Sequence, residues 1–143
     1  VAHEVLQLAG AADRVALCVG RACDWLSSGC LDPVDLLILD HRGTVYHEDL
    51  RNAEHLLSQH ARVLADNVLH PGAPMFVLDV QDRYDVEVHT VPEFGMPEVE
   101  DWLLLCKPKT WPIAASDADY ASMHFAEFRR WAVEVNRLCH QSQ

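Results

Sequence analysis

Continuous apolar runs are the first feature of this sequence, and two of them, RVALCVG at 14–20 and VDLLILD at 34–40, lie in its first forty residues. Unbroken apolarity over five or six positions is typical of a strand that helices bury on both faces of a parallel sheet. Further runs of strand composition follow, two of them separated by a Pro- and Gly-containing loop. The predicted strands are therefore 14–20, 34–40, 61–67, 84–91 and 100–106.

Helical spacing of apolar residues alternates with these runs. Residues 1–10 have this spacing and stop at Gly10, and residues 46–60 carry an inward stripe of Leu50, Ala53, Leu56 and Leu57. Shorter helices are predicted at 22–29 and after Pro74, and a closing helix at 117–138 with Phe125, Phe128, Trp131, Ala132 and Val135 inward. Alternating strands and helices predict an α/β fold.

Charge and cysteine content narrow the class of protein. The 22 acidic and 11 basic residues give a net charge of −11, which repels nucleic acid and anionic lipid. The five cysteines have no CxxC spacing, which favours buried reduced thiols and a reducing compartment over a disulfide framework or a zinc site. No apolar run approaches the roughly 20 residues of a spanning helix, and no signal-peptide layout is seen, so we expect a soluble chain.

Polar side chains follow two neighbouring strands of the predicted sheet. Asp40 and His41 end the strand at 34–40, and Asp66 and Asn67 end the strand at 61–67. The carboxyl ends of parallel strands converge on one crevice, where oxygen ligands suit Mg²⁺. The alternative is that each aspartate only caps a turn or the next helix, and spacing alone favours this structural role.

The amino-acid sequences of three segments are more informative about function than the spacing of their polar residues. LLILDHRG, then RVLADNVLHPGAP, then EVEDWLLLC resemble, in this order, the second half of the catechol O-methyltransferase family. The resemblance covers about residues 1–107, which we expect to form a partial methyltransferase-like domain, with a C-terminal extension at 108–143. It implies a Rossmann-like sheet of about five strands, with the first two family strands missing, helices on both faces and an extra C-terminal helix.

The resemblance also implies a cofactor, a metal ion and a set of site residues. Family members use S-adenosylmethionine and a Mg²⁺ ion that orients a catechol. By position, Asp40, Asp66 and Asn67 resemble the metal ligands. His41, with Asp40, resembles the cofactor side, and Pro71 resembles an apolar wall of the catechol site.

Several family positions are altered in this sequence. The general-base lysine falls on Gly43, and the neighbouring Arg42 stays protonated and cannot replace it. The pair beside the adenine falls on Ala22 and Cys23. A late carboxylate falls on Gly95, although Glu93 and Glu98 lie near it in the sequence. We name no catalytic residue.

The cofactor loop is a further departure, because no GxGxxG motif occurs. We therefore expect S-adenosylmethionine and Mg²⁺ to be absent from this chain alone, and the chain, which begins at Val1, to be a processed or fragmentary polypeptide.

Three functions remain open. The first is a non-catalytic methyltransferase-like domain, a pseudoenzyme that serves as a structural or interaction subunit of a larger assembly. The second is a Mg²⁺-dependent O-methyltransferase of catechol-type substrates, active only when an N-terminal half completes it. The third is an unrelated α/β binding module. A protein partner is expected in the first two cases, and a peripheral subunit of an organellar complex is among the locations that fit; substrate, stoichiometry and organelle are left open.

Overall fold

A computed structural model describes residues 1–114, 126–127, 130 and 133–134. The chain divides into two compact units, residues 1–31 and 32–143. The first unit contains two helices, α1 (Ala2–Leu8) and α2 (Ala22–Leu26), as the sequence predicts. No helix in the described parts of either unit combines the length and apolarity that a bilayer span requires.

The strand predicted at 14–20 is wrong, because these residues form no strand. Their apolar side chains are exposed, with Val15 at 43%, Leu17 at 48% and Val19 at 89% of full exposure. Strand propensity reflects packing against neighbouring strands, and residues 14–20 have no strand beside them among the described residues. The missing strand reduces the predicted count of about five to four.

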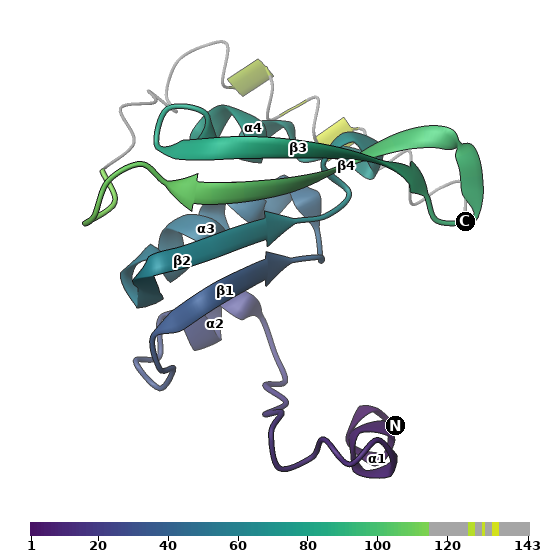
Figure 1. Ribbon diagram of the computed structural model, residues 1–143, viewed down its shortest axis with the longest axis vertical. Coiled ribbons are helices and arrows are strands. Elements are labelled where there is room, and N and C mark those ends of the chain that lie inside the picture. Colours follow the sequence, from purple (N-terminus) through teal and green to yellow (C-terminus); the bar gives the residue numbers. More distant parts are fainter. Residues whose placement is uncertain (115–125, 128–129, 131–132, 135–143) are drawn as a thin grey trace. The chain divides into compact units, whose positions relative to one another are not determined.

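The second unit is built on a mixed four-stranded sheet (Figure 1). Its strands are β1 (Val34–Leu39), β2 (Leu57–Ala65), β3 (Tyr84–Glu93) and β4 (Met96–Pro108). They lie in the order β1-β2-β4-β3, with β1 and β2 parallel and the other two pairs antiparallel. The predicted α/β fold class is thereby confirmed.

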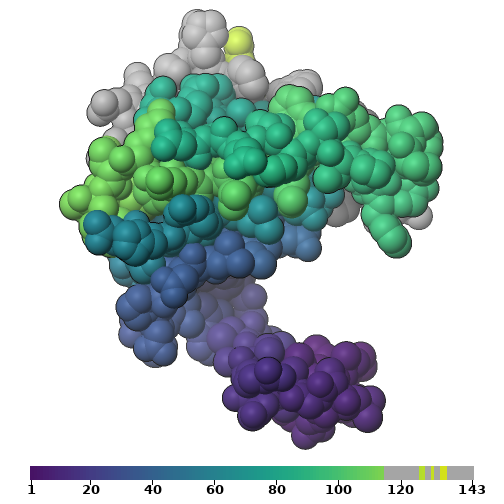
Figure 2. Space-filling view, in the orientation of Figure 1, coloured from purple at the N-terminus to yellow at the C-terminus, as the bar shows by residue number. Residues whose placement is uncertain are grey.

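Two element boundaries differ from the predictions. The helix expected over 46–60 ends early, since α3 (Tyr46–Ala53) passes into a 3-10 turn, η2 (Glu54–Leu56), and β2 begins at once. The loop expected over 92–97 is a tight turn, because Glu93 pairs with Met96 and Gly95 adopts φ +79. The resulting hairpin extends beyond the rest of the sheet (Figures 1 and 2).

Short helical elements connect the strands. A 3-10 turn, η1 (Gly43–Val45), precedes α3, and a π-type turn, η3 (Val68–Gly72), follows β2. The helix predicted after Pro74 is α4 (Pro74–Val80), with the proline in the first turn, where its missing N–H costs nothing. The closing helix predicted at 117–138 falls mostly outside the described residues.

The core lies between one face of the sheet and the helices α3 and α4, which are both seen behind the strands in Figure 1. The rings of Tyr46 in α3 and Phe76 in α4 meet edge to face at 5.9 Å. The predicted stripe of Leu50, Ala53, Leu56 and Leu57 is buried, as expected. Burial of these side chains supplies the main driving force for the fold.

A buried ionic network joins α3 and η2 to α4 and β3. The guanidinium groups of Arg51 and Arg83 both donate to the buried carboxylate of Asp79. Arg83 also donates to Glu54, which accepts a 2.9 Å hydrogen bond from the Tyr84 hydroxyl. Burial raises the pKa of Tyr84, with the Glu54 carboxylate adding to the effect. The network thus ties α3, η2 and α4 to the beginning of β3.

Candidate functional site

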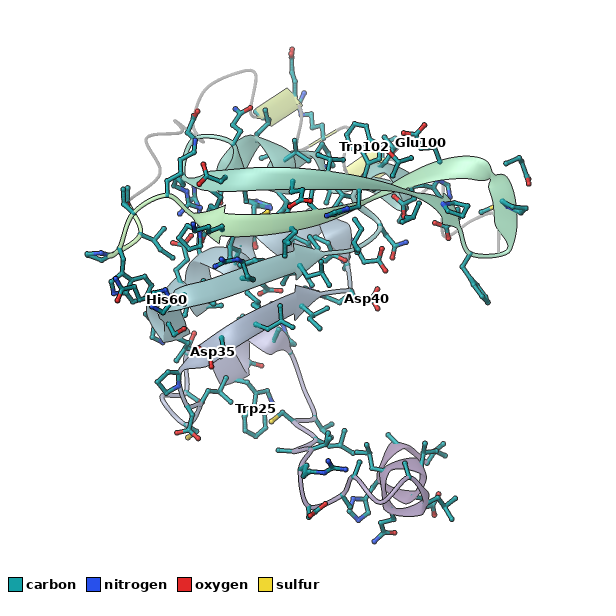
Figure 3. All side chains as sticks on the ribbon, viewed as in Figure 1. Trp25, Asp35, Asp40, His60, Glu100 and Trp102 are labelled. Carbon is teal, nitrogen blue, oxygen red and sulfur yellow. The ribbon has the colours of Figure 1, made fainter. Side chains whose placement is uncertain are left out.

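The carboxyl ends of β1 and β2 lie side by side. Leu39 is paired with Ala65, and the Asp66 N–H donates to the Leu39 carbonyl over 2.9 Å. Asp40, labelled in Figure 3, and Asp66 therefore follow adjacent parallel strands at the same edge of the sheet. Asp40 is exposed and Asp66 half-buried, so both carboxylates are open to a ligand. The sequence predicted this placement, and their role as metal ligands stays a prediction.

Asn67 is held in one orientation by the groups around it. Its backbone is left-handed, with φ 54, and its N–H donates to Asp66 Oδ1 over 2.8 Å. Its Nδ2 donates to Asp101 Oδ2 over 2.9 Å, with Glu93 Oε2 at 3.5 Å. An amide whose NH₂ group is engaged in this way presents its oxygen on the other side. Asn67 is thus prepared to act as an oxygen donor.

Asp101 is the residue that organises this loop, and it is not among the predicted site residues. It is 1% exposed, and Oδ1 accepts hydrogen bonds from the N–H groups of Leu69 (3.0 Å), His70 (2.9 Å) and Trp102 (2.7 Å). Burial acts to raise the pKa of Asp101, but these hydrogen bonds outweigh it and hold the pKa below its ordinary value of 3.8. One feature of the sequence could have identified Asp101: it is an acidic residue at the start of the apolar run DWLLLC.

His41 is fixed beside the end of β1. Its Nε2 is hydrogen-bonded to Asp49 Oδ2 at 2.8 Å, and its ring lies 4.9 Å from the ring of Tyr46. The Tyr46 hydroxyl donates to the Asp66 carbonyl over 3.2 Å. Burial and the nearby Asp40 carboxylate raise the pKa of Tyr46 to about 12, so the phenol stays protonated. His41 is therefore positioned on the same edge as Asp66, and its cofactor role stays a prediction.

Gly43, which the resemblance aligns with the general-base lysine, has no room for a side chain. It is buried, and a Cβ placed on it would lie 2.6 Å from the Gly72 carbonyl oxygen and 3.3 Å from the Ala73 Cβ. Contacts near 2.6 Å lie far inside van der Waals separation. A lysine at this position would have to displace the backbone of η3. The close approach of η1 to η3 explains why this loop carries a glycine.

The remaining predicted positions are less informative. Pro71 lies exposed in η3, and its role as an apolar wall stays a prediction. Ala22 and Cys23 lie on α2 in the first unit. Of the two late glutamates, Glu93 is half-buried near Asn67, whereas Glu98 is exposed.

The predicted metal ligands fit Mg²⁺ in their donor chemistry. Two carboxylates and one amide oxygen from adjacent strand ends are the hard oxygen donors that this ion takes, together with water. Across the described part of the chain, no group of three His, Cys, Asp or Glu side chains is arranged to hold a metal ion. A magnesium site at these strand ends would therefore need the amide of Asn67 as its third donor.

Comparison with known proteins identifies relatives that are named as O-methyltransferases or their homologues. No family model matches the chain. A transmembrane O-methyltransferase homolog from Mus musculus is 36% identical over 112 residues, which cover 71% of this chain and 43% of the relative. Catechol O-methyltransferase from Sus scrofa is 36% identical over 87 residues, covering 57% of this chain and 47% of the relative. The chain thus spans less than half the length of these relatives.

A solved structure supports the same relationship at the level of fold. The O-methyltransferase from Bacillus cereus, solved in complex with SAH, matches with a TM-score of 0.66 over 76% of this chain and 56% of its own. It is 17% identical, so the match concerns the fold alone. The sequence relatives confirm the predicted resemblance to the catechol O-methyltransferase family, and the solved structure adds agreement in fold.

Proposed function

We propose that this chain, a methyltransferase-like domain similar to part of the catechol O-methyltransferases, does not catalyse methyl transfer and serves as a structural or interaction subunit of a larger assembly. The observation that carries the proposal is the closed space at Gly43. In the family that this chain resembles, a lysine at this position removes the proton from the catechol hydroxyl. Here the backbone of Gly72 occupies the volume that its Cβ would need.

Two of the residues beside Gly43 cannot replace the lysine as a base. Arg42 is exposed and permanently charged, so it cannot accept a proton. Tyr46 stays protonated because burial raises its pKa to about 12. His41 is hydrogen-bonded to Asp49 through Nε2, and its other ring nitrogen can still accept a proton. The neighbourhood thus keeps the scaffold of a methyltransferase site without the lysine that serves as general base in the resemblance, and His41 is the base that remains beside it.

The free edge of β1 supports the role in an assembly. Among the described residues, β1 pairs with β2 on one side and with no strand on the other. Its side chains Leu36 and Ile38 are 52% and 57% exposed. An apolar edge strand with unpaired backbone groups is a template for a further strand from another polypeptide. The assembly proposed here pairs at this edge.

A second candidate function is a Mg²⁺-dependent O-methyltransferase that uses S-adenosylmethionine and is completed by residues outside these 143. The in-register ends of β1 and β2, which place Asp40 beside Asp66, favour it. In that case Asp40, Asp66 and Asn67 would hold the ion, and His41 would lie on the cofactor side. A bound Mg²⁺ would supply charge to ionise and orient the catechol oxygens. Asp101 would hold the side-chain amide of Asn67 in place, and the Tyr46 hydroxyl would hold the backbone of Asp66.

The proposed edge pairing predicts the effect of charge on β1. We expect the double variant Leu36→Lys, Ile38→Lys to weaken assembly at least tenfold, because lysines on an edge strand oppose strand addition. Sedimentation velocity of the full chain over a concentration series measures this. The wild type should sediment as a species larger than its 16.1 kDa monomer, and the variant should shift towards the monomer.

Phe94→Lys is the matched control, since Phe94 is 98% exposed at the hairpin tip, away from β1, and should leave the assembly unchanged. A monodisperse wild-type monomer that unfolds cooperatively would contradict the assembly role.

A further inference from the structure

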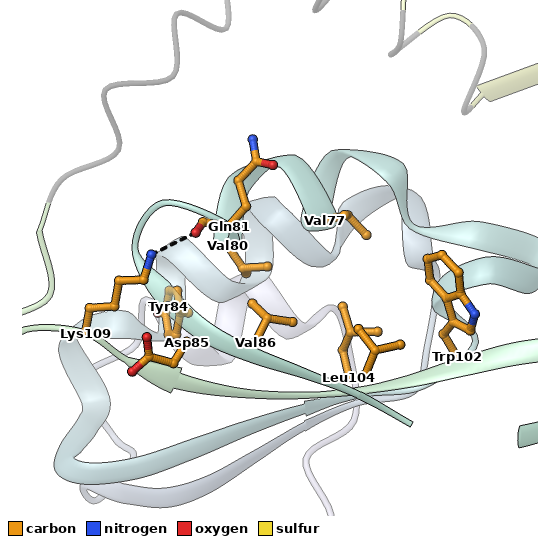
Figure 4. A pocket seen from close by; sticks show the side chains of 10 residues that line it. Val77, Val80, Gln81, Tyr84, Asp85, Val86, Trp102, Leu104 and Lys109 are labelled. Atoms are coloured by element: carbon orange, nitrogen blue, oxygen red, sulfur yellow. Dashed lines mark hydrogen bonds between the residues drawn. The ribbon is translucent and has the colours of Figure 1, made fainter. Parts of the chain in front are cut away.

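An apolar groove of about 330 Å³ lies between α4 and the outer part of the sheet (Figure 4). Val77 and Val80 of α4 form one wall, and Val86 and Leu104 of the sheet form the other. Trp102 closes one end. At roughly 30 Å³ per water molecule, this volume is enough for about ten waters, so large side chains can enter it.

The groove exposes apolar surface among the described residues. Val86 is 37% exposed, and Val88, further along β3, is 51% exposed. Apolar side chains gathered around a groove are a common mark of a docking surface. The groove is on the opposite edge strand from β1, because β3 and β1 are the two ends of the strand order. Its occupant is therefore a separate question from the pairing at β1.

The chain leaves the sheet beside this groove. Lys109 lines the end opposite Trp102, and its Nζ donates to the Gln81 carbonyl over 3.0 Å (Figure 4). It also donates to the Asp82 carbonyl over 3.2 Å. Ile113 packs against the same core cluster that contains Val80 and Leu104. The segment 115–143 is thus tethered next to the groove, and a short tether raises the effective concentration of its side chains to the millimolar range.

The described residues of that segment indicate which of its faces is turned outward. Residues 126, 127, 130, 133 and 134 are helical, and all of them are exposed, with Val133 at 56%. On an ideal helix, with 100° per residue, these five positions fall on one face. Sequence periodicity assigns the opposite face to the aromatic stripe, which consists of Phe125, Phe128, Trp131, Ala132 and Val135.

We propose that the groove between α4 and β3 is the docking site of the chain's own segment 115–143, through the aromatic stripe that includes Phe128 and Trp131. Two features support this occupant. The groove and the aromatic stripe are both apolar, and the stripe follows Ile113, which packs beside the groove, within thirty residues of the chain. The polar face of the helix, with Glu127 and Arg130, then remains in solvent. The inference is independent of the function proposed above.

Hydrogen exchange of the full chain, followed by mass spectrometry, tests the docking. In Trp131→Ser, we expect the amides of residues 125–135 to exchange at least tenfold faster than in the wild type, because the helix loses its packing partner. Val133→Ser is the control, since Val133 lies on the exposed face and should leave exchange unchanged.

A variant of the groove gives the reciprocal test. Val88→Ser alters a half-exposed position on β3, so the fold should persist, and exchange in residues 125–135 should rise as in Trp131→Ser. Unchanged exchange in both variants would overturn the proposal. Protection that depends on protein concentration would also overturn it, because a second copy of the chain would then be the occupant.

Discussion

Gly43→Lys is expected to destabilise the protein without creating a methyltransferase. The new Cβ would lie 2.6 Å from the Gly72 carbonyl oxygen, so η1 and η3 must move apart. Overpacking of this kind costs about 1 to 3 kcal/mol, and a long charged side chain in a buried position adds desolvation to that cost. Urea unfolding of the variant and the wild type measures the difference in the free energy of unfolding.

Arg42→Lys is the matched control for this substitution. It places a lysine one position earlier on the same loop, where the side chain is exposed, and should change the free energy of unfolding by less than about 0.5 kcal/mol. If Gly43→Lys were as stable as the control and gained methyl transfer, the space at position 43 would not be closed, and the non-catalytic role would lose its basis.

Asp101→Ala is expected to release the loop that carries Asn67. The substitution removes the carboxylate that accepts from three N–H groups, those of Leu69, His70 and Trp102, and leaves the Asn67 amide with only its longer contact to Glu93. Each unsatisfied buried donor costs about 1 to 3 kcal/mol, and relaxation of the loop into water lowers the sum. We expect a loss of about 3 kcal/mol in urea unfolding, with faster amide exchange at residues 67–72.

The contribution of Asp101 to the free energy of unfolding depends on pH in a direction that its pKa determines. The folded pKa of Asp101 lies below its ordinary value of 3.8, so its contribution to stability is fully present above that value. It is lost as pH falls through the lower, folded pKa. Glu98→Ala, at an exposed position of β4, is the control and should leave both stability and its acid dependence unchanged. Equal behaviour of the two variants would contradict the organising role of Asp101.

Local sequence predicted the strand ends well, because the strands that carry them are specified by their own residues. VDLLILD and ARVLADN each combine apolar strand residues with a polar turn, and parallel pairing then brings Asp40 next to Asp66. The resemblance to the catechol O-methyltransferase family added the prediction that these two aspartates are metal ligands. The hairpin of β3 and β4 and the helix after Pro74 were predicted for the same local reasons.

The errors arose where tertiary context decides. Residues 14–20 have strand composition, but no described strand pairs with them. Leu57 fits the helical stripe, yet it is buried equally well as the first residue of β2, so apolar spacing cannot distinguish the two. Gly43 and Asp101 depend on contacts with residues about thirty positions away in the sequence, which no local pattern shows.

The most direct test of the central claim, that the domain is non-catalytic, is methyl transfer itself. The longest natural form of the protein, purified with whatever copurifies, is incubated with labelled S-adenosylmethionine, Mg²⁺ and a catechol, and labelled product is counted. We predict no product above the uncatalysed background. Product formation that is lost on Asn67→Ala, and kept in the exposed control Phe94→Ser, would contradict the claim and establish the second candidate function.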